Sequence, residues 1–359
     1  MTSTASTSNH LRGLTATRFV KSLAVAKGDP VLAVAYAEGQ NWRTTPNVLP
    51  GLKAAVGAMD TTDAAALLAE VGFDFSEFMR PQTIIGRLAG LRKVPFQVRC
   101  LQMDTGTSAG WVGEAQPAPV SRADFSGEIL PLLKVVGICV TTLELARSSA
   151  PSAESTLSRD LARAGAEAMD RAFIDPSNAG ETGVKPASVT SSAPSFASNG
   201  PDLADIDSDL EILINSLSDA GSDLSFAAFV LRPRTAVYLS RLRGSGGAPA
   251  FPGLGARGGV LLGLPAITSA NVPVGADSAA ETSIVLLDAA QITLADDSEA
   301  ELAITTQATL QMQDSIEETG ATEQVGLWQL NLAAVRMVMA RNWRTRQAAA
   351  CSVLTGVTY

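Results

Sequence analysis

The sequence predicts an α+β fold built from amphipathic helices and many short strands. Apolar residues recur at helical spacing over 152–175 and 202–220, whereas Val, Ile and Leu gather in strand-like runs such as 226–231 and 260–268. Hydrophobic residues make up 46% of the 359-residue chain and charged residues 18%, which is typical of a protein that buries much of its surface. A chain of this length suits one elaborate domain or several smaller ones.

The first 75 residues are predicted to form an arm. Residues 1–10 are rich in Ser and Thr, and we expect them to be disordered or to become ordered only against a partner. Two Ala-rich helical runs follow, at 15–39 and 46–59, and the polar stretch 41–46 separates them. Such helices are not expected to fold without another surface to pack on.

Residues 94–142 are predicted to form a long two-stranded β-hairpin. Its flanking runs, 94–103 and 128–142, are rich in Val, Ile and Leu, and the stretch between them is rich in turn-forming residues. A two-stranded hairpin is marginally stable in water unless a third surface supports it. If the chain itself does not cover this hairpin, a neighbouring subunit must.

The middle of the chain contains the clearest helices. The helix at about 152–175 is predicted to begin at Ser152 as its N-cap and to end before Pro176, and 177–200 is predicted to be a loop and a boundary. Further on, the pattern predicts a helix at 202–220, a strand at 226–231, a helix at 233–243, a long flexible loop at 244–259 and a strand at 260–268.

The last third is predicted to be rich in strands, at 283–287, 292–294, 302–312 and 333–341. Residues 277–323 carry 11 acidic and no basic side chains, and four arginines follow: Arg336, Arg341, Arg344 and Arg346. These opposite charges are suited to pairing across subunits. A solvated acidic face explains the acidic block equally well, because exposed ion pairs contribute only ~0–1 kcal/mol.

The sequence lacks the residues that common catalytic sites need. Its single histidine, His10, lies in the polar N-terminal stretch, so a serine or cysteine hydrolase mechanism has no suitable base. The run 253–258 matches G-x-G-x-x-G, but a loop precedes it and a strand follows, which is the wrong order for a dinucleotide site. The three cysteines are widely spaced and form no C-x-x-C pair. We therefore expect no catalytic, cofactor-binding or metal-binding residues.

The charge distribution also restricts the partners. The net charge is −9, and all the acidic excess lies in residues 201–359. A protein that binds nucleic acid needs clustered basic residues, so this chain is not expected to bind nucleic acid directly. The sequence begins without an apolar signal-peptide core and contains no run of 18 apolar residues. We predict neither a signal peptide nor a membrane span.

Several stretches, in the same order, resemble the major capsid proteins of tailed double-stranded-DNA bacteriophages, which have the Hong Kong 97 type fold. They are the hairpin tip Trp111-Val-Gly-Glu114 with the following Pro117, Pro119 and Phe125, the run 132–175, GLPAITSANVP at 263–273, and LWQLNLAAVRMVMARNWR at 327–344.

The resemblance implies a domain organisation. It comprises an N-terminal arm (1–75), an extended loop (94–140), a peripheral domain (76–93, 141–200 and 276–359) with a spine helix at about 152–175, and an axial domain (201–275). In this family the extended loop lies over an adjacent subunit. The arm is expected to be retained in the shell.

The resemblance also implies a role. The chain would be a non-catalytic virion protein, made in the host bacterial cytoplasm, that assembles into hexamers and pentamers around DNA. Its partners would be a scaffold or prohead protease, a portal and a decoration protein. The residues expected at inter-subunit interfaces are Arg80, Arg87, Trp111, Glu114, Phe125, Arg336, Arg341 and Arg344.

One departure from part of the family has a clear consequence. Some members link subunits covalently through a lysine in the extended loop, but here no lysine occurs between Lys93 and Lys134. Covalent linkage by that route is therefore expected to be absent.

Two other hypotheses remain open at the level of sequence. An encapsulin-like compartment has the same fold and encloses protein instead of DNA, but the long N-terminal arm argues against it. A soluble α+β enzyme would require a pocket with converging polar groups, and would be expected to remain a monomer.

Overall fold

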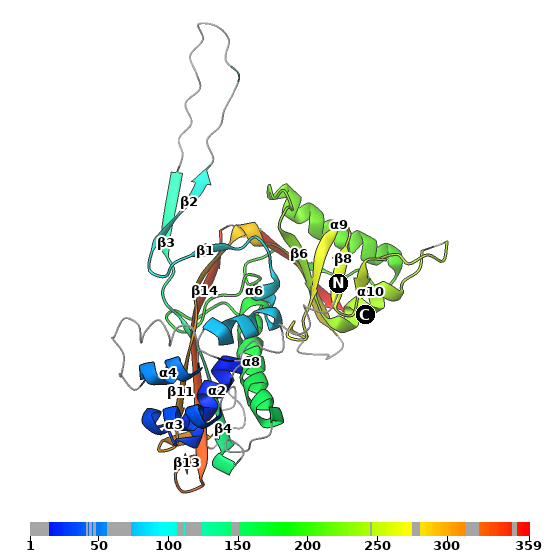
Figure 1. Ribbon diagram of the computed structural model, residues 1–359. Coiled ribbons are helices and arrows are strands. Elements are labelled where there is room, and N and C mark those ends of the chain that lie inside the picture. Colours follow the sequence, from blue (N-terminus) through cyan, green and yellow to red (C-terminus); the bar gives the residue numbers. More distant parts are fainter. Residues whose placement is uncertain are drawn as a thin grey trace. The chain divides into compact units, whose positions relative to one another are not determined.

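The computed structural model describes residues 14–40, 42, 45, 48–55, 73–105, 111, 124–144, 151–244, 246–274, 281–312, 323–346 and 350–359. The chain divides into two compact units, each assembled from separate stretches (Figure 1). The first unit contains Met1–Arg87, Lys134–Arg171 and Ser298–Ala340; the second contains Leu88–Leu133, Ala172–Asp297 and Arg341–Tyr359. Both mix helices with strands, which confirms the predicted α+β class.

Three short helices begin the described part of the first unit: α2 (Leu14–Val25), α3 (Pro30–Gln40) and α4 (Val48–Ala55). The prediction of one helix over 15–39 was wrong, because the chain turns between α2 and α3. Lys27 and Gly28 both have positive φ angles, 56° and 86°, and the Asp29 carboxylate accepts hydrogen bonds from the N–H groups of Val31 and Leu32. This Asp-Pro start caps α3. Residues 1–10 lie outside the described residues.

The core of the first unit joins these helices to a long helix, α8 (Pro151–Ile174). As predicted, α8 ends before Pro176, although it begins one residue before Ser152. Phe19 and Leu52 from the N-terminal helices share one hydrophobic cluster with Leu161 and Met169 of α8. The helix at 73–79, the turn η1 (Arg80–Gln82) and α6 (Ile84–Arg87) add further buried side chains, including Phe75, Met79 and Ile84.

A four-stranded sheet has the order β1-β11-β14-β4, with β1 (Arg92–Val94), β11 (Ile292–Thr305), β14 (Leu332–Thr345) and β4 (Lys134–Thr142). β4 and β14 are antiparallel, from Leu332↔Thr142 to Ala340↔Lys134. The sequence predicted one strand over 128–142, paired with 94–103. For 134–142 this was wrong, because these residues form β4 and pair with β14. Pro131 lacks the N–H that would continue the ladder, and the chain leaves the hairpin there.

Two small hairpins complete the description of these segments. The first consists of β2 (Arg99–Thr105) and β3 (Asp124–Ile129), which pair only with each other, with a register shift between Met103 and Thr105. It lies within the predicted extended loop; except for Trp111, residues 106–123 are outside the described residues. The second consists of β12 (Thr309–Met312) and β13 (Glu323–Gly326).

The second unit is built around a seven-stranded sheet with the order β5-β15-β10-β6-β9-β8-β7. Its strands are β5 (Ser195–Ala197), β6 (Ala227–Leu231), β7 (Leu254–Gly255), β8 (Gly258–Leu261), β9 (Leu264–Thr268), β10 (Thr282–Asp288) and β15 (Cys351–Val357). The helices α9 (Leu203–Asp219) and α10 (Pro233–Arg241) match the predicted ones, and α9 buries Ile206, Leu210, Leu213 and Leu217 in the cluster beside the sheet.

Two predictions in this unit were wrong. The predicted strand at 260–268 is two strands, because Leu262 and Gly263 form a turn with positive φ angles of 50° and 83°. The predicted flexible loop at 244–259 contains β7 and the start of β8, so the G-x-G-x-x-G run lies in a strand hairpin. The sheet also takes β5, β10 and β15 from outside 201–275, the range expected for the axial domain.

Candidate inter-subunit surfaces

The segment just before the hairpin contains an ion pair and a buried hydrogen bond. Arg80 forms an exposed ion pair with Glu77 (Nη1 to Oε1, 3.1 Å). Burial lowers the pKa of the Arg87 guanidinium from its ordinary value, and the nearby Asp170 carboxylate opposes this shift. Asp170 is fully buried on α8 and accepts a 2.8 Å hydrogen bond from the N–H of Ile84. Both predicted arginines therefore lie close to the point where the chain leaves the first unit.

The hairpin presents apolar side chains to solvent. Trp111 is fully exposed, and Val98, Ile129 and Leu132 are exposed near the base. Of the other two predicted tip residues, Glu114 lies outside the described residues, and Phe125 is placed only by its backbone, opposite Met103.

The arginines of β14 have different environments. Arg336 and Glu301 form an exposed ion pair of 3.3 Å, whereas Arg341 and Asp296 form a buried one of 3.2 Å. Both pairs join β14 to the adjacent strand β11 within one chain. The acidic block and these arginines were considered suited to pairing across subunits. These two ion pairs instead form within one subunit. Arg344 is exposed farther along β14.

Sequence reasoning missed an apolar surface on β4. Val136 and Ile138 are 52% and 53% exposed, while Val135 and Cys139, on the opposite face of the strand, pack against the core of the first unit. The cross-strand partners of Val136 and Ile138 are Val338 and Arg336. This surface is called the β4 face below. The sequence does not show which side chains along 134–142 are exposed, because the side chains on both faces of the strand are apolar.

A second apolar projection is the turn between β13 and β14, residues 327–331. Trp328 is 79% exposed and Leu330 is 59% exposed, while Leu327 between β13 and Trp328 is fully buried. Of the four tryptophans, Trp343 is buried and Trp42 packs on the core of the first unit.

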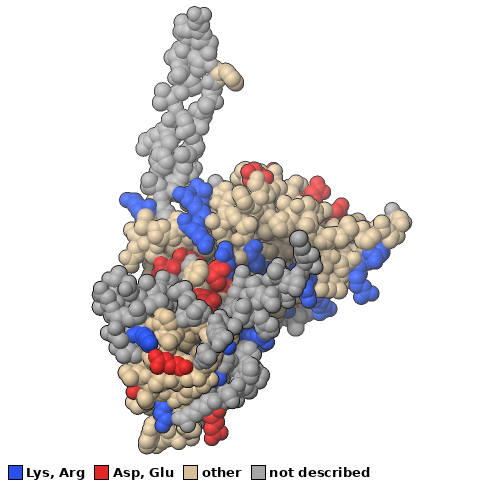
Figure 2. All heavy atoms as spheres, viewed as in Figure 1, with Lys and Arg blue, Asp and Glu red and all other residues tan. Residues whose placement is uncertain are grey.

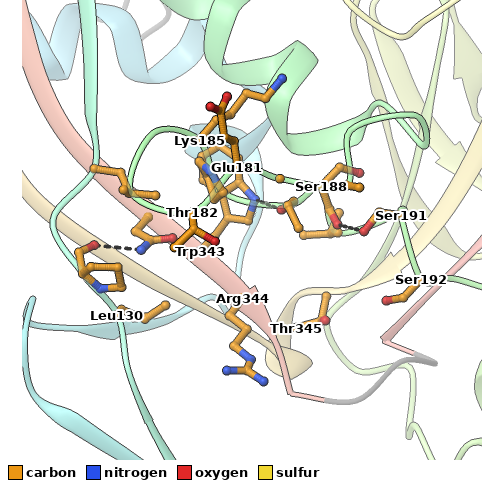
Figure 3. A pocket seen from close by; sticks show the side chains of 18 of the residues that line it. Leu130, Glu181, Thr182, Lys185, Ser188, Ser191, Ser192, Trp343, Arg344 and Thr345 are labelled. Carbon is orange, nitrogen blue, oxygen red and sulfur yellow. Dashed lines mark hydrogen bonds between the residues drawn. The ribbon is translucent and has the colours of Figure 1, made fainter.

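The second unit contains an open pocket of about 590 Å³ (Figure 3). Residues from 129–133, 179–192 and 342–346 line it. Its walls are held by hydrogen bonds within the chain: Trp343 Nε1 donates to the Ala187 carbonyl (2.9 Å) and Asn342 Nδ2 to the Pro131 carbonyl (2.7 Å). In Figure 3 the charged ends of Lys185 and Arg344 extend toward opposite sides. The pocket does not bring these polar groups together as an active site would.

The thiols described are ordinary packed cysteines. Cys351 is buried, its Sγ–H donates to the Val189 carbonyl, and burial raises its pKa to about 12. Burial, assisted by the charge of Asp160, also raises the pKa of Cys139. Within the ranges the structure describes, no cluster of three or more His, Cys, Asp and Glu side chains is arranged to hold a metal ion.

Charges of both signs are interspersed on the face drawn in Figure 2, and its described residues show no continuous basic stripe. No helix among the described residues is both long and apolar enough to span a membrane.

Known proteins share both the sequence and the fold. The phage capsid family matches residues 78–335. The capsid polyprotein of Pseudomonas phage PAJU2 is 37% identical over 320 residues, or 86% of this chain and 48% of that protein. The chain thus spans about half the length of that curated relative.

Solved structures similar to this chain include one from Mycobacterium phage Ogopogo (TM-score 0.56, 16% identity, covering 76% of this chain and 92% of that chain). Another is from Gordonia phage Cozz (TM-score 0.53, 20% identity, covering 74% of this chain and 84% of that chain). At these identities the likeness shows the fold, which is the Hong Kong 97 type. Together with the family match, it establishes that the chain belongs to the phage capsid family, whose members are structural proteins of the virion and not enzymes.

Proposed function

We propose that this chain is a major capsid protein whose copies assemble into hexamers and pentamers of an icosahedral phage head enclosing double-stranded DNA. The observation that carries the proposal is the hairpin β2–β3. Among the strands that the structure describes, β2 and β3 pair only with each other, and apolar side chains are exposed at the base of the hairpin and at Trp111. An isolated two-stranded sheet of this kind needs a further surface, and a neighbouring copy supplies one.

The β4 face is suited to receive that hairpin. β4 is an edge strand of its sheet and exposes Val136 and Ile138, beside the half-buried Val338 on β14. Burying exposed apolar area is the main driving force of association. The hairpin and the β4 face are different surfaces of one chain, so their contact is heterologous and generates closed rings when the rotation between copies closes.

The interface residues in this proposal are Arg80, Arg87, Trp111, Glu114, Phe125, Arg336, Arg341 and Arg344. Arg341, which is buried against Asp296, acts by holding β14 in place, and the exposed members make the contacts. The domain organisation in this proposal comprises an arm at 1–75, an extended loop at 94–140, an axial domain at 201–275 and a peripheral domain from the remaining segments. A scaffold or prohead protease, a portal and a decoration protein complete the assembly.

The shell is proposed to be held together without covalent links through the extended loop. No lysine is present between Lys93 and Lys134 to form them. Its strength then comes from buried area spread over many contacts. On a denaturing gel of purified particles we expect only the monomer band, and a ladder of covalent multimers would contradict this part of the proposal.

Electron microscopy with light scattering on the chain expressed alone tests the assembly. We expect closed icosahedral shells, or rings of five and six copies that close when a scaffold is added. A monodisperse monomer under all conditions would overturn the proposal. Particles that enclose protein cargo and never DNA during infection would instead identify an encapsulin-like compartment.

A further inference from the structure

Two tryptophans stand out from all other large apolar side chains that the structure describes. Trp111 is 106% exposed and Trp328 is 79% exposed, and no other large apolar side chain in the described ranges exceeds 59%. A tryptophan left in water on a folded surface is unusual, because burying it removes ~150–250 Å² from solvent. Tryptophan is also enriched among the few residues that dominate interface energetics.

Trp328 is held on a defined turn. The N–H of Leu332 donates to the carbonyl of Leu327 (2.9 Å), and the N–H of Leu327 donates to the carbonyl of Ala308 (3.1 Å). The Asn331 carbonyl accepts from the N–H of Leu143 (3.0 Å), which ties the turn to the end of β4. Leu327 is buried beneath the turn, so Trp328 and Leu330 are presented outward by a fixed backbone. Preorganised apolar groups lose little entropy on binding.

We propose that Trp111 of one copy packs against Trp328 and Leu330 of a neighbouring copy. This inference rests on the proposed function and names where the extended loop fastens. Residues that dominate an interface tend to pair with similar residues on the partner. A second copy supplies the complement of each surface, because the two exposed tryptophans belong to the same chain. The contact fastens the loop without the lysine chemistry that this sequence lacks.

The position of the turn agrees with the surface proposed for the hairpin. The turn leads directly into β14, whose first residue Leu332 pairs with Thr142 at the end of β4. A hairpin lying along the β4 face therefore meets the 327–331 turn at the end of the same pair of strands. From Val136 to Thr142 a strand advances roughly 20 Å, at ~3.3 Å per residue. Val136 and the turn are thus within reach of one extended loop.

A double-mutant cycle on assembly tests the pairing. We expect Trp111→Ala and Trp328→Ala each to raise the critical concentration for shell assembly about tenfold, measured by light scattering, as for a residue that dominates an interface. The double variant should raise it no more than either single variant does, because either change removes the whole contact. Val184→Ala, at a residue that is 59% exposed outside both surfaces, should change it less than about twofold.

A second experiment shows whether the contact joins two copies. Chains carrying Trp111→Cys and chains carrying Trp328→Cys are co-assembled and oxidised, and a non-reducing gel should show disulfide-linked dimers. Shells made from either variant alone, and mixed shells pairing Trp111→Cys with Val184→Cys, are the controls and should show at least tenfold less dimer. Thermal melts of the free variants establish that each chain folds.

Three outcomes would overturn the inference. Multiplicative effects in the double variant would mean that the two tryptophans contact different partners. Shells that form normally but give no specific Trp111–Trp328 dimer would place the loop elsewhere, and capture of Trp328→Cys by a decoration protein would assign the turn to that protein. Failure of the unmodified chain to form shells would instead count against the proposed function.

Discussion

The carboxylate of Asp170, fully buried on α8, accepts a 2.8 Å hydrogen bond from the N–H of Ile84, 86 residues earlier in the chain. This bond anchors the first turn of α6 to the spine helix. Only three residues later the chain leaves the first unit, after Arg87, and continues toward the hairpin. Asp170 therefore fixes the segment from which the extended loop starts.

Asp170→Ala is expected to destabilise the chain by ~1–3 kcal/mol, because a buried N–H loses its acceptor and a small cavity remains. Urea denaturation of the unassembled chain measures the change. Glu167→Ala, at an exposed position on the same helix, is the matched control and should change stability by less than ~0.5 kcal/mol. Equal effects of the two variants would show that the Asp170 bond does not contribute as its burial implies.

The two ion pairs between β11 and β14 should differ strongly in energy. The Arg341 and Asp296 side chains are 5% and 8% exposed, whereas those of Arg336 and Glu301 are 51% and 67% exposed. Arg341→Met alone removes the ion-pair partner of a buried carboxylate and should cost ~3–5 kcal/mol. Arg336→Met should cost at most ~1 kcal/mol, because water screens that pair.

The double replacement Arg341→Met with Asp296→Leu separates charge from packing. It should recover most of the stability lost in Arg341→Met, since an apolar pair of similar volume avoids the desolvation of both charges. Chemical denaturation of the unmodified chain and these three variants provides the comparison. A double variant no more stable than Arg341→Met would contradict this account.

One glycine of the G-x-G-x-x-G run, Gly258, is required by strand packing. Gly258 has a φ of +90°, and a Cβ there would overlap the carbonyl oxygen of Ala266 on the neighbouring strand β9. Gly258→Ala should therefore cost more than ~2 kcal/mol, combining backbone strain with overpacking. Gly183 has a similar φ of +80° but nothing within 4 Å of its Cβ position, so Gly183→Ala reports the backbone strain alone. A smaller loss for Gly258→Ala than for Gly183→Ala, measured by thermal unfolding, would contradict this account.

The elements with strong local signals were predictable from sequence. Helix α9 ends near a glycine, α8 ends before Pro176, and α10 begins with Pro233, and all three were placed within about two residues. The break before α3 was missed although Gly28 and Pro30 signal it, because the Ala-rich pattern continues on both sides. β15 was missed because its neighbours in the sheet, β10 and β5, are remote in sequence.

The candidate surfaces were harder to predict than the fold. The sequence marks Trp111 and Trp328 as large aromatics, but it does not show that Leu327 turns inward while Trp328 turns outward. The sequence predicted that the β4 residues pair with 94–103 in the hairpin, because strands adjacent in sequence usually pair. In the structure β4 pairs instead with β14, some 200 residues away, and this leaves Val136 and Ile138 exposed.

Alkaline pH should destabilise the second unit through Cys351. Burial raises the pKa of this thiol from about 9 to about 12, because the folded state excludes the thiolate from water. A group whose pKa is raised on folding contributes its full stability below the unfolded pKa and loses it as the pH rises toward the folded value. Stability should therefore fall between about pH 9 and pH 12.

Cys351→Ala isolates this contribution. The variant loses some packing at every pH, but its stability should decline less steeply than that of the unmodified chain above about pH 9. The remaining decline includes Tyr359, whose pKa burial also raises to about 12. Urea denaturation at intervals from pH 8 to pH 11 measures the two slopes, and parallel slopes would show that Cys351 does not titrate with unfolding. Because the thiolate is the reactive form, Cys351 should also resist alkylation at pH 8 until urea unfolds the chain.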